Sequence, residues 1–219
     1  MRFLITGTDT RVGKTMLGCA LAFAFKVRGM RVGVMKPVES GCAEANGILT
    51  PSDGPALIAS ASSDLPIELV TPYCYRSVLP PAPAAQADGV ALPSFDTICD
   101  RYRQIAARSD AILVEDCGGL AAPIDWQHTY ADLATDLRFE VILVVANRGA
   151  FINAAKLTSE YATLRGITIR GFVMSALDRD ASATIARDAD FIARATGLSC
   201  LGTVRFKEPV SRKIVERLL

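Results

Sequence analysis

A glycine-rich stretch with a lysine and a threonine follows the first apolar run of the chain. It reads GTDTRVGKT over residues 7–15 and lies directly behind the apolar residues 3–5. A glycine-bearing turn between a strand and a helix directs backbone N–H groups and the positive end of the helix dipole at one anionic spot. In such a loop a lysine at the position of Lys14 reaches terminal phosphates, and a hydroxyl at the position of Thr15 binds Mg²⁺. These residues predict a nucleoside triphosphate site.

The spacing within this loop departs from the common pattern. That pattern is G-x-x-x-x-G-K-[ST], with four residues between its glycines, whereas five residues separate Gly7 from Gly13. Two interpretations follow from the residues alone: a damaged nucleotide site, or a variant loop that serves another task.

An acidic residue at the end of another strand is the second part of such a site, because a carboxylate there holds the metal directly or through water. Glu115 ends the run AILVE and is the best candidate, with an acid on a surface turn as the alternative. Asp116 is set aside, because adjacent side chains on a strand point to opposite faces. Asp53, in PSDGPAL, is either the N-cap of a helix that begins near Pro55 or a second metal ligand, and sequence alone favours the cap.

Two further residues have open roles. Lys36 leaves a predicted strand in the motif MKPVESG, and either extends to solvent or points into the site. His128 is the only histidine and lies in the polar turn DWQHTYAD, where an ordinary loop histidine is expected. Because no G-x-S-x-G nucleophile motif is present either, covalent acyl transfer is not expected.

Length and composition favour one soluble domain with a small-molecule partner. The 219 residues, 50% of them apolar, predict a single domain over residues 1–219. The net charge of +1 gives no reason to expect nucleic acid or an anionic membrane as partner. The six cysteines are scattered without C-x-x-C pairing, and the first apolar run is too short for a signal peptide, so a cytoplasmic protein with reduced thiols is expected.

Apolar runs alternate with segments of helical periodicity, which predicts an α/β fold around a mostly parallel sheet with helices on both faces. The predicted strands are residues 3–6, 32–37, 111–115, 141–146, 169–175 and 201–204. The predicted helices are residues 14 to about 27, 95 to about 107, 129–137, 152–164, 181 to about 195, and from near 213 to the end, with Gly29, Gly166 and Gly197 as C-terminal caps. Residues 79–93 contain four prolines and predict a loop with little regular structure, either a surface connection or a covering loop.

Several separated motifs together resemble the dethiobiotin synthetase family, a group of P-loop NTPase-fold enzymes. The motifs are GTDTRVGKT, KPVESG, SDGPAL, LVEDCGG and VILVVANRGAFINAAKLT, in the order and rough spacing of that family, and the resemblance runs from residue 1 to about residue 176. It implies a homodimer that converts 7,8-diaminononanoate, CO₂ and MgATP to dethiobiotin, ADP and phosphate. The implied route passes through a carbamate and a carbamic-phosphoric anhydride. The family's own loop has the same five-residue spacing.

The resemblance also assigns roles to individual residues. Lys14 and Lys36 would neutralise the transferred phosphoryl group, and Thr10 and Ser40 would line the carbamate and diamine pocket. The implied ligands of Mg²⁺ are Thr15, Asp53 and Glu115. The implied nucleotide contacts are Asp9, Arg11, Val12, Gly13, Lys14, Thr15, Met16, Glu115, Ser175 and Arg205. The implied substrate contacts are Thr10, Lys36, Ser40, Gly118, Ala150 and Asn153, of which the last two lie in GAFIN at a helix start that receives the substrate carboxylate across the subunit interface. Arg148 either adds charge there or is an exposed arginine.

Three residues depart from the family pattern. Arg11 stands where relatives have Glu or Gly, and Arg205 stands where a proline is usual near the base. Ser175 stands where the family pattern has an asparagine that reads the adenine edge. A serine offers one hydroxyl, whereas the planar amide of an asparagine offers both a hydrogen-bond donor and an acceptor. The nucleotide is therefore expected to be ATP or another nucleoside triphosphate.

Two alternatives to this function remain, of which the first belongs to another class of protein. A partition or septum-type P-loop switch carries a signature lysine five residues before the loop lysine, and that position holds Asp9 here. The second alternative is a related synthetase that acts on another small amine. Synthetases of the same superfamily that continue into a glutaminase domain need more than 219 residues.

Overall fold

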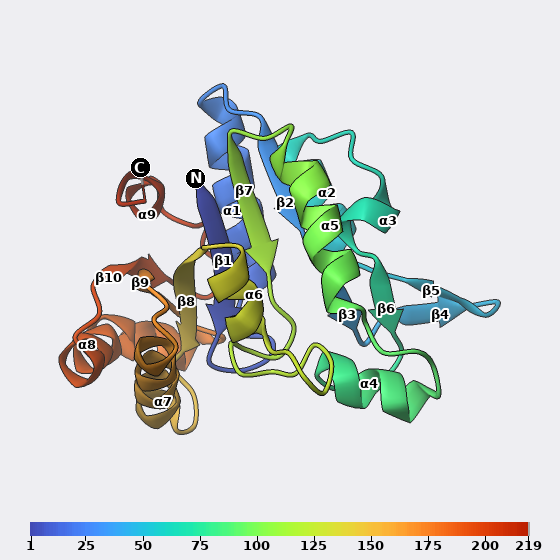
Figure 1. Cartoon of the computed structure of the whole chain (residues 1–219). Helices are drawn as coiled ribbons and strands as arrows, with labels where there is room; N and C mark the ends of the chain where they lie inside the picture. Colours follow the sequence, from blue (N-terminus) through green and yellow to red (C-terminus); the bar gives the residue numbers. More distant parts are fainter. Residues whose placement is uncertain (219) are drawn as a thin grey trace.

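The computed structural model describes residues 1–218, and its centre is a sheet of six parallel strands in the order β10-β9-β8-β1-β7-β2 (Figure 1). The strands are β1 (Arg2–Gly7), β2 (Val32–Met35), β7 (Ala111–Glu115), β8 (Glu140–Ala146), β9 (Ile169–Ser175) and β10 (Cys200–Val204). Each predicted strand is found, because runs of β-branched and apolar residues suit strands that are covered on both faces. All six strands end at one edge of the sheet.

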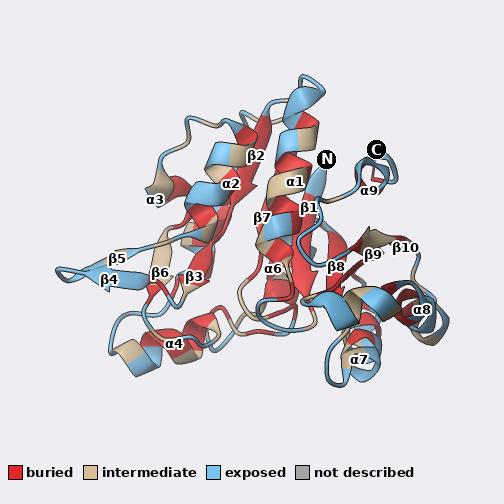
Figure 2. Ribbon diagram, turned by 180° about the vertical axis from the view of Figure 1, so that it is seen from behind, coloured by how far each residue is buried: buried red, intermediate tan, exposed pale blue. Residues whose placement is uncertain are grey.

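Helices cover both faces of the sheet, as predicted, and alternate side chains of each strand pack against them. On β8, Ile142 and Val144 belong to the core beneath α1 (Lys14–Val27), α2 (Asp53–Ala61) and α9 (Arg212–Glu216). The opposite face of β8 packs, through Val141, Leu143 and Val145, in the cores beneath the other long helices. These helices are α5 (Phe95–Ala106), α6 (Tyr130–Asp136), α7 (Phe151–Leu164) and α8 (Arg179–Thr196). Figure 2 shows the central strands as the most buried part of the chain.

Short elements follow β2 at the edge where the strands end. They are β3 (Val38–Ser40), β4 (Ala43–Ala45), β5 (Ile48–Thr50), α3 (Ile67–Val70) and β6 (Tyr73–Tyr75). Strands β3 and β6 form a separate parallel pair, whereas β4 and β5 form an exposed antiparallel hairpin that projects from the body (Figures 1 and 2). Helix α2 lies between β5 and α3 in the chain, so these short elements place its start near the edge where the strands end.

The prediction of a loop with little regular structure over residues 79–93 was wrong in its middle, where α4 (Pro81–Asp88) forms. Pro81 is the first helical residue, and Pro83 is in the first turn, where backbone N–H groups have no partner within the helix. Alanines complete the helix, and Gly89 ends it with a φ of 69° in the left-handed region. Prolines therefore begin this helix instead of preventing it.

The predicted helix ends agree with the structure. Gly29, Gly166 and Gly197 have φ values of 82°, 66° and 76°, and Gly197 caps α8 directly. The last predicted helix begins at Arg212, and its final residue, Leu219, lies outside the described residues. Among the helices of residues 1–218, none combines the length and the apolar character needed to cross a membrane.

Candidate active site

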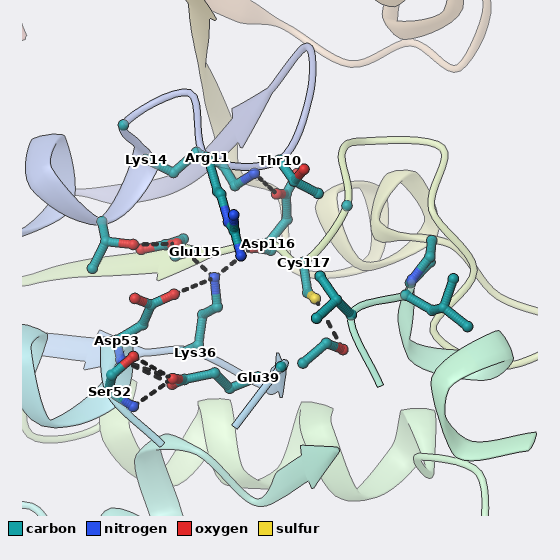
Figure 3. A pocket seen from close by; sticks show the side chains of 18 of the residues that line it. Thr10, Arg11, Lys14, Lys36, Glu39, Ser52, Asp53, Glu115, Asp116 and Cys117 are labelled. Carbon is teal, nitrogen blue, oxygen red and sulfur yellow. Dashed lines mark hydrogen bonds and ion pairs between the residues drawn. The ribbon is translucent and has the colours of Figure 1, made fainter. Parts of the chain in front are cut away.

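A cavity of about 450 Å³ opens at the edge where the central strands end (Figure 3). The loop before α1, the segment after β2, the start of α2 and the loop after β7 form its walls. The predicted residues among its walls are Thr10, Arg11, Gly13, Lys14, Thr15, Met16, Lys36, Ser40, Asp53, Glu115 and Gly118. Residues from three distant parts of the sequence thus meet in one cavity, as parallel strands allow.

The phosphate loop enters α1 through Gly13, which has a φ of 100°. A Cβ at this position would lie 3.2 Å from Ser175 Oγ, so a larger residue would be both strained and crowded. Lys14 and Thr15 are the first residues of α1, and their side chains line the cavity. The Lys14 ammonium donates to the Asp9 carbonyl at 3.2 Å.

Arg11 occupies the longer part of this loop in a left-handed conformation, with a φ of 55°. Its side chain is exposed and borders the cavity. The loop therefore presents a second cation beside Lys14, at the position where the sequence departs from the family pattern.

Asp116 lines the same cavity as Glu115, although the alternation of side chains on a strand predicted that it points away. Strand β7 ends at Glu115, and the alternation of side chains does not extend to the next residue. The buried Asp116 carboxylate accepts a hydrogen bond from the Thr6 hydroxyl and lies 3.4 Å from the Lys14 ammonium. Asp116 therefore forms a buried ion pair with the phosphate-loop lysine.

Lys36 points into the cavity and not to solvent. Its backbone N–H donates to the Val70 carbonyl at 2.9 Å, which fixes the chain just beyond β2. Its ammonium lies 2.5 Å from Glu115 Oε1, 3.2 Å from Asp53 Oδ2 and 2.9 Å from the Asp116 carbonyl (Figure 3). Since only 4% of Lys36 is exposed, these oxygens replace its water shell.

The N-cap interpretation of Asp53, which sequence alone favoured, was wrong. Ser52 is the N-cap of α2, and Asp53 is the first helical residue. The Asp53 carboxylate pairs with Lys36 and lines the cavity. Its position is therefore that of a site residue.

The electrostatics of this group follow from burial and pairing. Burial opposes the charged form of Lys36, but Glu115 and Asp53 outweigh it and raise the lysine pKa above its ordinary value. Burial also raises the pKa of Glu115, and the neighbouring Lys36 limits this shift. Two carboxylates face one ammonium here, which leaves an excess of negative charge if both are ionised.

The same group can accept a divalent cation. The Thr15 hydroxyl lies 2.9 Å from Glu115 Oε1, while Glu115 Oε2 is buried without a hydrogen-bond partner. Carboxylate and hydroxyl oxygens are ligands that Mg²⁺ prefers. Residues 1–218 contain no cluster of three or more acidic, histidine or cysteine ligands, so such an ion would take further oxygens from phosphates and water, as in P-loop sites.

The other end of the cavity has an apolar wall and a hydroxyl. Val78, Leu79 and Pro80 form the wall, directly before α4. Ser40 lies at the end of β3, and the Cys117 thiol donates to its hydroxyl at 3.4 Å. The first part of residues 79–93 therefore covers one side of the cavity.

Glu39 was missed in the sequence, although the motif MKPVESG contains it. Its buried carboxylate accepts hydrogen bonds from backbone N–H groups at the start of α2, including that of Asp53 at 2.9 Å. The donors lie 13 to 15 residues further along the chain. The antiparallel hairpin of β4 and β5 returns the chain between Glu39 and these donors, and no motif in the sequence predicted it.

The remaining predicted residues lie around this cavity and not in it. Asp9, Val12 and Ala150 line a neighbouring hollow of about 350 Å³, and Ala150 and Asn153 line another of about 590 Å³ at the start of α7. Ser175 is buried beneath Gly13 at the end of β9, and Arg205 is exposed after β10. Ala150, Asn153 and Arg205 therefore lie outside this cavity, whereas Ser175 lies against the phosphate loop.

Arg148 contacts the phosphate loop. Its guanidinium lies 2.9 Å from the Asp9 carboxylate and donates to the Thr10 carbonyl at 3.0 Å. The Thr10 N–H and then Arg148 hold the pKa of Asp9 below its ordinary value, against partial burial. The segment before α7 thus supports the loop from outside.

Arg148→Gln is expected to weaken nucleotide binding by less than about fivefold, because half-exposed ion pairs contribute roughly 0–1 kcal/mol. The exposed fractions of Arg148 and Asp9 are 49% and 58%. Titration with a nucleotide at low and high salt measures this effect, which salt should reduce. Arg108→Gln, at the exposed end of the segment after α5, is the control. A loss beyond about tenfold would show that Arg148 contacts the nucleotide itself.

Comparisons with known proteins agree with this geometry. A family model described as an AAA domain matches residues 1–213. The chain is 36% identical over 208 residues to the ATP-dependent dethiobiotin synthetase BioD of Anaeromyxobacter sp. (strain Fw109-5), which covers 95% of this chain and 87% of the relative. A ParA family ATPase from Chlorobium tepidum TLS has a similar fold, with a TM-score of 0.51 and 17% identity over 98% of this chain and 87% of that structure. The chain therefore belongs to the dethiobiotin synthetase family and is a P-loop ligase.

Proposed function

We propose that this protein carboxylates 7,8-diaminononanoate with CO₂ and closes the ring to dethiobiotin, at the expense of ATP, which becomes ADP and phosphate. The observation that carries the proposal is the placement of Lys36. It lies between a phosphate loop on one side and Ser40 with an apolar wall on the other, within one cavity. A phosphoryl group and an aliphatic diamine can therefore meet beside one buried cation.

The proposed reaction needs no covalent bond to the protein. One amine of the substrate adds to CO₂ and loses a proton, which gives a carbamate. A carbamate oxygen attacks the γ-phosphorus as the bond to ADP breaks. The second amine then attacks the carbamoyl carbon and loses a proton to the departing phosphate, the C–O bond to phosphate breaks, and the cyclic urea closes.

The residues of the cavity have corresponding roles. Lys14 and Lys36 neutralise charge that develops on the phosphoryl oxygens, which is the main need of such a step. Thr10 and Ser40 hold the carbamate and the diamine, and Gly118 leaves room beside them. Thr15, Asp53 and Glu115 would hold Mg²⁺, which would supply further positive charge to the phosphates.

The distant carboxylate of the substrate would bind at the start of α7 in the partner subunit of a homodimer. The hollow of about 590 Å³ beside Ala150 and Asn153 supports this part of the proposal, since a helix N-terminus favours an anion. Ser175 and Arg205 lie nearer to the base of ATP, or of another nucleoside triphosphate. The net charge of only +1 supports small-molecule partners over nucleic acid or an anionic membrane.

Phosphate release should depend on the diamine. Purified protein with MgATP and bicarbonate is expected to release phosphate only after 7,8-diaminononanoate is added, and to form dethiobiotin in equal amount. The measurement is a coupled phosphate assay together with mass spectrometry of the product. Other nucleoside triphosphates in the same assay test the base preference at Ser175.

The alternatives give different results in this assay. A partition or septum-type switch would hydrolyse ATP without the diamine, although Asp9 at its signature lysine position pairs with Arg148 here. A synthetase for another small amine would release phosphate with that amine and not with 7,8-diaminononanoate. Either outcome would overturn the proposed substrate.

A further inference from the structure

The carboxylate of Glu39 accepts hydrogen bonds from the first turn of α2. Glu39 lies on β3, only 4% of it is exposed, and its side chain reaches the residues that begin the helix (Figure 3). Glu39 Oε1 accepts from the backbone N–H of Ser52, from the Ser52 hydroxyl at 3.0 Å and from the Asp53 N–H at 2.9 Å. Glu39 Oε2 accepts from the N–H of Asp53 at 3.0 Å and of Gly54 at 3.1 Å.

These bonds replace the cap that α2 lacks. The Ser52 side chain makes no capping hydrogen bond to the helix backbone, so the first N–H groups of α2 depend on Glu39. No ion pair to Glu39 is found within residues 1–218, so backbone dipoles compensate its charge there. Charge-assisted bonds of this kind are roughly twice as strong as neutral ones.

The backbone that Glu39 binds includes that of Asp53, whose carboxylate lines the cavity. Both oxygens of Glu39 bind the N–H of Asp53, whose own Oδ2 lies 3.2 Å from the Lys36 ammonium. Lys36 in turn contacts Glu115 at 2.5 Å. The direction of the Asp53 side chain relative to Lys36 and Glu115 therefore depends on where Glu39 fixes the helix start.

Glu39 also connects this helix to the opposite wall of the cavity. Strand β3 pairs with β6 through Val38, Glu39 and Ser40, so the backbone of Glu39 is itself held. Ser40 follows directly and lines the cavity. One residue thus sets the distance between the Asp53 side and the Ser40 side.

We infer that Glu39 is a positioning residue that sets Asp53 for binding Mg²⁺ with the nucleotide. The inference rests on the role of Asp53 in the proposed function. Residues that orient metal ligands typically change metal affinity by about 10- to 100-fold when they are removed. Glu39 acts through the backbone of the ligand and does not touch the metal.

The test compares nucleotide binding with and without the metal. Calorimetry with the non-hydrolysable analogue β,γ-methylene-ATP, in Mg²⁺ and in EDTA, gives the gain in affinity that Mg²⁺ provides. Glu39→Ala is expected to lose about 10- to 100-fold of this gain, with little change in EDTA. Glu39→Gln keeps one acceptor oxygen and is expected to lose less, which also provides a variant that folds if the alanine variant does not.

Asp132→Ala is the matched control, because Asp132 belongs to the capping box of α6 and accepts from the N–H and the hydroxyl of Thr129. It should lower the melting temperature without changing the gain from Mg²⁺. Hydrogen exchange should show faster exchange of the amides of residues 52–54 in Glu39→Ala only. Equal gains from Mg²⁺ in wild type and Glu39→Ala would reduce Glu39 to a structural cap and overturn the inference.

The two proposals fail in different ways. If the wild type gains nothing from Mg²⁺, Asp53 holds no metal, and both the metal site and the role of Glu39 are wrong. If the gain is present and Glu39→Ala loses it, while the diamine assay shows no turnover, the inference about Glu39 stands and the proposed substrate is wrong.

Discussion

Lys36→Met is expected to abolish phosphate release and to destabilise the fold. The variant removes the cation that lies 2.5 Å from Glu115 and 3.2 Å from Asp53, and leaves Glu115 buried without its partner. Removing one member of a buried pair costs about 3–5 kcal/mol of unfolding free energy. Loss of one preorganised charge at a transition state lowers turnover by a factor on the order of 10²–10³. Urea unfolding and single-turnover phosphate release measure the two effects.

The double variant Lys36→Met with Glu115→Gln separates the effect on stability from the effect on turnover. It removes the unpaired buried charge as well as the cation, so part of the unfolding free energy should return, whereas turnover should not. Turnover near that of wild type in the single variant would contradict the proposed role of Lys36. Recovery of turnover in the double variant would assign the loss to misfolding.

Lys14→Gln is expected to abolish turnover while the fold stays intact. The Lys14 ammonium contacts the Asp9 carbonyl at 3.2 Å and lies 3.4 Å from Asp116, which keeps its bond from Thr6. Lys14 pairs with one carboxylate at 3.4 Å, whereas Lys36 pairs with two at 2.5 and 3.2 Å, so the loss of stability should be smaller than for Lys36→Met. The loss of charge at the phosphoryl group should lower kcat by a factor on the order of 10²–10³.

The control for Lys14 is Lys26→Gln on the same helix. Lys26 donates to the Ser62 hydroxyl at 2.7 Å on the surface, and its replacement should leave kcat unchanged. Steady-state kinetics and melting curves of both variants complete the test. Unchanged turnover in Lys14→Gln would remove the loop from the mechanism.

The fold was predictable because its central strands are encoded locally. Runs such as residues 141–146 are apolar throughout, which is what burial on both faces requires. Helix α4 was not predictable from the sequence. Pro81 and Pro83 indicate a loop unless they fall in the first turn of a helix, and the start of this helix was not evident. Its position depends on packing, since Ala82, Ala84 and Ala85 are buried.

The residues of the site also divide into those that were predictable from the sequence and those that were not. The phosphate loop and Glu115 were identifiable because each lies next to a predicted strand end. Asp116 was misassigned because the alternation rule was applied one residue beyond β7. The contact of Glu39 with the start of α2, and the position of Asp53, depend on the short, largely exposed β4 and β5 hairpin, which has no clear pattern in the sequence.

The pairing of Lys14 with Asp116 means that the phosphate-loop ammonium already has a buried carboxylate as its partner. An incoming anion must compete with a buried carboxylate for that ammonium, and Thr6 keeps the competitor in place. An anion that contacts Lys14 alone gains little in this exchange, whereas a polyphosphate that also contacted Lys36 and the loop N–H groups would gain several charge-assisted bonds. This pair is therefore expected to favour binding of a nucleoside triphosphate over binding of inorganic phosphate.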